Sequence, residues 1–127
     1  MSMQERVYEF DISEQQLLKK TVTYDPFVDS SITKEQLEQI KQDKYANVIF
    51  VRQNCILKDG TLLGMDKGKC YLYIKAEDHF MGPAEERLKR DFKSVKRSDK
   101  ETEEKIISKI REEESNSNSG VGMIFGG

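Results

Sequence analysis

The segment from 47 to 75 reads NVIFVRQNCILKDGTLLGMDKGKCYLYIK, and it holds the two longest apolar runs in a chain otherwise rich in charge. Residues 48–51 form the first run and residues 70–74 the second. A half-exposed strand alternates apolar and polar residues, whereas a strand covered on both faces has no need to. The sequence therefore predicts a central strand at each run, in a sheet that is covered on both faces.

Turn and alternation patterns predict the remaining strands. Residues 6–12 alternate in the manner of a half-buried strand, with the aromatic face turned inward. Asp59-Gly60 between apolar pairs indicates a two-residue hairpin. The middle of the chain is then a meander of three strands, the second of them short, and one more short strand is expected over 92–97.

Capping motifs predict where the helices begin. The Ser/Thr to Gln/Glu spacing of a capping box occurs three times: Ser13 with Gln16, Thr33 with Gln36, and Ser98 with Glu101. A further helix is expected at Pro83, because proline is tolerated in a first turn. We expect the second helix to run to about residue 43 with Leu37 and Ile40 facing inward. The last helix should bury a narrow isoleucine stripe (Ile106, Ile107 and Ile110).

Taken in order, these elements predict an α+β fold. The expected sheet is antiparallel with ferredoxin-like (βαββαβ) order, plus an extra hairpin strand, an extra short N-terminal helix and a C-terminal helix. The alternative is a β-meander with helices at its ends. The chain has 127 residues, the size of one domain, which we place at 1–114, followed by a flexible tail over 115–127.

Composition narrows the classes of function. Charged residues make up 35% of the chain but the formal net charge is only −2, so no whole-protein field favours nucleic acid or anionic lipid. No run has the length of a membrane span and the N-terminus has no apolar segment, so we expect a soluble cytoplasmic protein with no membrane partner. Cys55 and Cys70 are expected to be reduced, buried thiols. With His79 as the single histidine, no metal and no cofactor are expected.

No catalytic motif is present in the sequence. There is no Walker loop, no dinucleotide fingerprint and no arrangement of a histidine with acids and a nucleophile. Asp78-His79 comes nearest, and a lone pair of this kind is more often a turn. We therefore lean towards a protein that is not an enzyme, although carboxylates that meet only in space leave no mark in a sequence.

One segment resembles a nucleic-acid-binding family. Lys67, Gly68, Tyr71 and Leu72 resemble the RNP1 segment of RNA recognition motifs. That family stacks the bases of single-stranded RNA on aromatic side chains of its sheet, so the resemblance implies RNA binding through Tyr71 and Tyr73. The alternative is that both tyrosines pack beneath a helix or a loop.

A basic segment is the second candidate surface. Residues 87–100 contain seven basic and two acidic side chains, and the following helix is acidic. Lys93, Lys96 and Arg97 are the residues that would meet an acidic partner or a phosphate backbone. The alternative is local pairing on solvated faces, where each pair contributes less than about 1 kcal/mol.

The C-terminal segment is the third candidate. Val121, Met123, Ile124 and Phe125 are apolar residues behind a Ser/Asn tether, and they predict a docking peptide for another protein. Packing on the same domain and inert disorder are the alternatives. The final Gly126-Gly127 pair is similar to that of ubiquitin-like and sulfur-carrier proteins, which implies a modifier activated at its terminal glycine.

The connection over 21–31 is the fourth candidate. It carries three large residues, Tyr24, Phe27 and Val28, around an Asp-Pro step. We favour packing of this loop on the core over recognition of a partner. The sequence as a whole predicts a small binding module with another protein as its partner, with RNA binding and a modifier role as alternatives.

Overall fold

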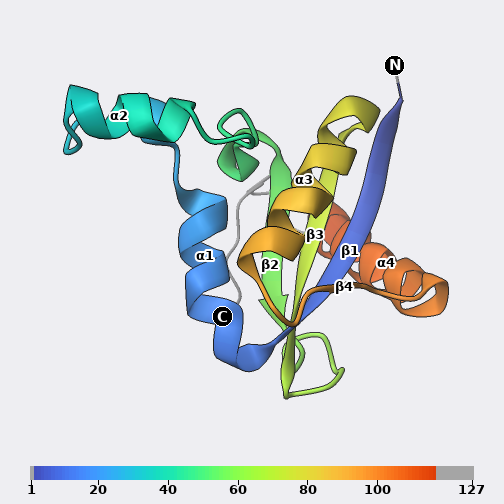
Figure 1. Ribbon diagram of the computed structural model, residues 1–127. Helices are drawn as coiled ribbons and strands as arrows, with labels where there is room; N and C mark the ends of the chain where they lie inside the picture. Colours follow the sequence, from blue (N-terminus) through green and yellow to red (C-terminus); the bar gives the residue numbers. More distant parts are fainter. Residues whose placement is uncertain (1, 117–127) are drawn as a thin grey trace.

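The computed structural model describes residues 2–116, and within them four strands form one antiparallel sheet in the order β2-β3-β1-β4 (Figure 1). The strands are β1 (Met3–Asp11), β2 (Asn54–Asp59), β3 (Lys69–Glu77) and β4 (Lys96–Arg97). The helices are α1 (Gln15–Thr23), α2 (Lys34–Lys41), α3 (Asp78–Asp91) and α4 (Lys100–Asn116). Three short 3₁₀ turns complete the fold: η1 (Ile12–Glu14), η2 (Pro26–Val28) and η3 (Phe50–Arg52). The fold is α+β, as predicted.

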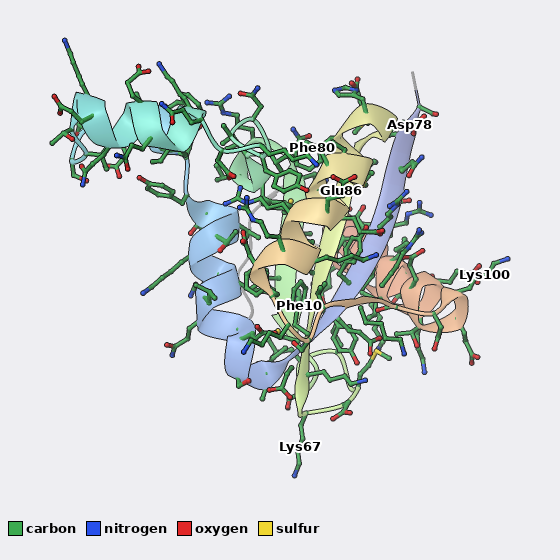
Figure 2. All side chains as sticks on the ribbon, in the orientation of Figure 1. Phe10, Lys67, Asp78, Phe80, Glu86 and Lys100 are labelled. Carbon is green, nitrogen blue, oxygen red and sulfur yellow. The ribbon has the colours of Figure 1, made fainter. Side chains whose placement is uncertain are left out.

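Helices cover both faces of the sheet. In Figure 1, α1 and α3 lie on one face and α4 lies behind the strands on the other. The first face packs Tyr8, Phe10 and Leu72 against apolar residues of α1 and α3, and Figure 2 shows Phe10 and Phe80 in this layer. The second face packs Tyr73 against Ile110 of α4. Burial on both sides follows from the unbroken apolar run of β3, as predicted for a central strand.

The predicted strand at 48–51 is wrong. Val48, Ile49 and Phe50 are buried, but the chain turns there and forms η3. Its backbone groups pair outside the sheet: Val48 N–H donates to Tyr45 O (2.9 Å), and Val48 O accepts from Arg87 Nη1 of α3 (2.5 Å). An apolar run indicates that its residues are buried, but not which backbone hydrogen bonds they form. The strand that pairs with β3 on this side lies further along the chain, at β2.

The predicted extra hairpin strand is also absent. Residues 60–68 form a series of turns in which Met65 N–H donates to Gly60 O (2.7 Å) and Leu62 N–H donates to the Asp59 carboxylate (2.8 Å). Leu63 is buried on the α4 side, whereas Leu62 is about half exposed. Asp59-Gly60 does begin a turn, but the side chain of Asp59 draws the chain into a wider loop.

Helix ends agree with the sequence in part. The Thr33–Gln36 capping box is present in both directions, at 3.1 and 2.8 Å. The box at Ser13 is not, because Ser13 N–H donates to Asp11 and the chain makes η1 before α1. Pro83 lies inside α3, which begins at Asp78. The strand expected over 92–97 is shortened to β4.

The last helix also departs from its predicted cap. At α4, Asp99 and not Ser98 accepts the hydrogen bond that caps the helix, from Thr102 N–H (2.8 Å). The isoleucine stripe is confirmed, with Ile106 and Ile110 buried and Ile107 partly buried against the same cluster.

Gly60 is required by the loop between β2 and β3. A Cβ placed there would lie 1.7 Å from the carbonyl oxygen of Asp66. We expect Gly60→Ala to lower the free energy of unfolding by about 2 kcal/mol or more, because backbone must move to admit the methyl group. The control is Gly82→Ala in α3, where no atom beyond its chain neighbours lies within 4 Å. There we expect a change under about 1 kcal/mol in urea unfolding. Equal losses at both sites would contradict this view of the loop.

The packing of α4 on the second face of the sheet can also be tested by substitution. Ile110 is 2% exposed, so Ile110→Ala should leave a cavity and cost about 2–5 kcal/mol. Ile107→Ala, on the same helix but only partly buried, should cost clearly less. Thermal or urea unfolding of the two variants measures this, and equal costs would mean that α4 does not pack as described.

Candidate functional site

One part of the chain stands away from the sheet and its covering helices, which we call the body. We call residues 24–46, which include η2 and α2, the arm. Figure 1 shows α2 projecting beyond α1, and Figure 2 shows its side chains spread around the helix. No residue of α2 is buried, and Leu37 and Ile40, which the sequence predicts to face inward, are only half buried. The arm therefore adds little to the core.

Short polar residues shape the arm from within. Asp25 precedes Pro26 in an extended conformation and accepts a hydrogen bond from Phe27 N–H (3.0 Å), which starts η2. Asp29 accepts from Ser31 N–H (2.9 Å) and from Tyr24 Oη (2.7 Å). The hydrogen bond to Asp29 raises the pKa of Tyr24, which stays neutral.

Two arginines attach the arm to the body. Arg52 of η3 binds both oxygens of Asp25, at 2.8 and 3.2 Å, and lies over the Phe27 ring at 5.5 Å. Arg90 of α3 contacts Asp43 at 2.5 and 3.2 Å and lies over the Tyr45 ring at 4.9 Å. These arginines hold the pKa of each carboxyl below its usual value.

The attachments are weak individually. Exposed ion pairs contribute under about 1 kcal/mol each, and a cation over an aromatic ring contributes about 0.5–1 kcal/mol at such sites. The arm is therefore held by surface contacts and a few half-buried side chains rather than by a core of its own.

A groove runs between the arm and the body. One hollow of about 200 Å³ is lined by apolar and aromatic side chains with a charged edge: Tyr24, Pro26, Ile40, Asp43, Tyr45, Ala46, Ile49 and Arg87. A second, of about 440 Å³, shares Tyr24 and Arg87 and adds Lys20, Thr21 and Thr23. We call the two together the arm groove. Its floor is apolar, and the second hollow has two cations and no carboxylate among its lining residues.

Arg87 supplies the best placed polar group in the groove. Its Nη1 donates to Val48 O at 2.5 Å, and the guanidinium lies over the Phe50 ring at 5.6 Å. Its Nε is buried without a hydrogen bond among the described residues, since the Asp91 oxygen is 3.5 Å away. The guanidinium is thus held between Val48 O, the Phe50 ring and the Asp91 carboxylate, and its side chain remains 23% exposed at the groove.

Two large side chains of the arm are exposed. Val28 is 77% exposed and Tyr24 is 42% exposed. Phe27 and Tyr45 are half buried beside them. Aromatic residues and arginine gathered around a partly apolar hollow are the composition of protein interfaces.

The structure places the two candidate tyrosines beneath α4. Tyr71 and Tyr73 are 4% and 2% exposed and pack with Val7, Ile56 and Ile110. Tyr73 Oη donates to Glu5 at 2.6 Å. As they lie here, neither ring has a face open to a base, which agrees with the alternative of packing beneath a helix.

The basic candidates are exposed but do not form one site. Arg97 is paired with Glu103 at 2.9 and 3.0 Å. Lys96 lies on β4 beside a hollow of about 460 Å³ that it shares with Lys69 and Glu9, and these two pair with each other at 2.7 Å. Lys93 is exposed in the connection before β4. Most of the basic segment therefore pairs locally, with Lys93 and Lys96 open to solvent.

The remaining predicted site residues lie outside the described part of the chain. Val121, Met123, Ile124 and Phe125, and the final glycine pair, belong to residues 117–127. Their role as a docking peptide or a modifier terminus stays a prediction.

Three further features concern the histidine, metal binding and membrane spans in residues 2–116. His79 is in the first turn of α3 with its side chain 71% exposed, 3.3 Å from Glu77. Within residues 2–116 there is no group of three or more histidine, cysteine or acidic side chains that could hold a metal ion. The same residues contain no helix with the length and apolar character needed to cross a bilayer.

Sequence reasoning named only part of the arm groove. The sequence presents the connection over 21–31 as a candidate surface, and Ile40 and Tyr45 follow it in the same arm, but Arg87 comes from α3, far along the chain. In the sequence Arg87 is one of seven basic residues of the segment 87–100. Nothing in local spacing shows that Arg87 reaches Val48, and only the packing of η3 against α3 brings them together.

Comparison of the chain with protein-family models, with curated proteins and with solved structures gives no match.

The two thiols should be inert in the folded protein. Both are free and buried, and burial raises the pKa of Cys55 from 9.0 to about 12. A raised pKa in the folded state adds stability that is complete below pH 9 and is lost as pH rises towards 12. We expect the unfolding free energy to fall over this range, with a shallower fall in Cys55→Ala. Urea unfolding at pH 8, 10 and 11 measures this, and rapid reaction of both thiols with Ellman's reagent in the folded state would contradict it.

Proposed function

We propose that the protein is a binding module that takes up a segment of another protein in the arm groove. The observation that carries the proposal is the exposure of Tyr24 at an apolar hollow edged by Arg87, with Val28 exposed on the same arm. Large exposed side chains next to a hollow are costly in water and gain most when a partner covers them.

The charges of the groove suggest the chemistry of the partner. Arg87 and Lys20 line the second hollow, with no carboxylate among its lining residues, whereas the first is lined mainly by apolar and aromatic side chains, with Asp43 and Arg87 as its charged residues. An apolar segment with at least one carboxylate would bury the floor and pair with the guanidinium. The arginine would orient the segment, and the aromatic side chains would supply most of the contact area.

We also propose that the fold is ferredoxin-like. The support is that β3 lies between β1 and β2, antiparallel to both, and that β4 pairs with the outer side of β1. A strand inserted between two others in this way is the split βαβ arrangement. In this reading α1 and α2 stand in the first crossover, α3 stands in the second, and α4 is an addition.

RNA binding through Tyr71 and Tyr73 is the alternative function, and it would require a change in the structure. Because α4 covers that face, RNA could stack on it only after α4 had moved away. The arm groove needs no such change.

A selected peptide tests the function directly. Linear peptides displayed on phage are enriched on the full chain, and the best one is synthesised with a fluorescent label. We expect apolar sequences with an acidic residue, and at least about a tenfold loss of affinity in Tyr24→Ser, which removes a ring that lines both hollows. The matched control is Leu62→Ser, a comparably exposed position in the β2–β3 loop, which should bind as the unchanged chain does.

Two outcomes would contradict the proposal. Equal binding by Tyr24→Ser and Leu62→Ser would place the peptide elsewhere. Salt-sensitive binding of a single-stranded RNA oligonucleotide that perturbs the signals of Tyr71 and Tyr73, with no enrichment of peptides, would favour the RNA alternative.

A further inference from the structure

The outer edge of β2 carries backbone groups whose direction can be assigned. Gly60 N–H donates to Lys69 O at 2.8 Å, so Gly60 and the alternate residues before it point their N–H and C=O groups at β3. Cys55 and Leu57 have the opposite phase. Their N–H and C=O groups therefore point away from β3, to the side of the sheet where β2 is the last described strand.

These edge groups are buried. Cys55 is 0% and Leu57 is 1% exposed, so water does not reach their backbone. Yet no described residue beyond the β-ladder forms a backbone hydrogen bond with either of them. A buried N–H or C=O without a partner costs about 1–3 kcal/mol, and native proteins rarely leave such groups unpaired. The edge of β2 thus requires a strand-like partner from outside the described residues.

The chain itself supplies a suitable segment close by. The C-terminal part of α4 lies close to β2, because Glu113 of α4 is 2.7 Å from Lys58 Nζ of β2. Residues 117–120 (Ser-Asn-Ser-Gly) follow and can span about 13 Å when extended, against about 4.8 Å between neighbouring strands. Residues 121–125 come next, with a length close to that of β2.

The composition of that segment suits an edge strand. Val121, Met123 and Phe125 alternate, so one face of an extended chain would carry three large apolar side chains. Valine, isoleucine and phenylalanine are also favoured in strands. On the face of the sheet that holds Cys55 and Leu57, such side chains would extend the apolar layer beneath α1.

We propose that residues 121–125 pair with the outer edge of β2 in the same chain, as a fifth strand of the sheet. The pairing satisfies the buried N–H and C=O groups of Cys55 and Leu57 and removes a long edge that could pair with other chains. It assigns the C-terminal segment to the sheet, and it is independent of the arm groove, so either proposal can fail without the other.

Amide hydrogen exchange of the full chain tests the pairing. The amide of Leu57 should exchange slowly, like that of Ile56, which faces β3. Replacing Val121, Met123 and Phe125 together with serine should speed exchange at Leu57 by on the order of tenfold relative to Ile56. The matched control is Met3→Ser with Leu62→Ser, which removes two exposed apolar side chains and should leave that ratio unchanged.

Each other result overturns the proposal. Fast exchange of Leu57 in the unchanged chain would mean that its N–H has no partner, and slow exchange that survives the triple substitution would mean that another segment covers it. Protection that appears only with dimer formation in sedimentation would assign the edge to a second copy. Should the triple variant fail to fold, Hα contacts between residues 121–125 and β2 in the NMR spectrum of the unchanged chain decide the matter, and their absence counts against the pairing.

Discussion

Burial of β3 on both faces is the constraint on which the other elements depend. Tyr71 and Tyr73 on one face and Leu72 and Ile74 on the other are all at most 4% exposed. A sheet whose central strand is apolar on both sides needs two covering layers. The α1–α3 layer supplies one and α4 the other, and each uses a few large apolar side chains set in helices that are otherwise charged.

The same constraint explains why the sheet faces are not available as binding surfaces here. The charge of the chain is concentrated on outer helix faces, where acidic and basic side chains pair along and between helices, as Lys89 does with Glu85. Single exposed apolar side chains such as Met3, Leu17 and Leu62 occur elsewhere, but on the arm an exposed aromatic side chain, Tyr24, lines a hollow. The arm offers this combination because α2 lies beyond the end of the sheet layers and contacts mainly η2.

Periodicity and capping chemistry allowed much of this architecture to be predicted, and its failures have a common cause. The run of β3, the box at Thr33 and the stripe through Ile110 are local patterns, and the structure contains all three. A strand at 48–51 is the wrong prediction because this run is buried by contacts with Phe80 and Arg87, thirty or more residues away. Side-chain contacts over such distances leave no local pattern, and they also built the arm groove.

The groove lies beside an arm that is only weakly held to the body. Side chains of such an arm are not needed for the core, so they can be used to contact a partner. Arg52 and Arg90 each form an ion pair with a carboxylate of the arm at the surface. Each guanidinium also lies over an aromatic ring of the arm. Such contacts fix direction more than they add stability. The arm can therefore keep Tyr24 and Val28 exposed without loss to the core, since the free energy of folding is set in the layers around β3 and not in α2.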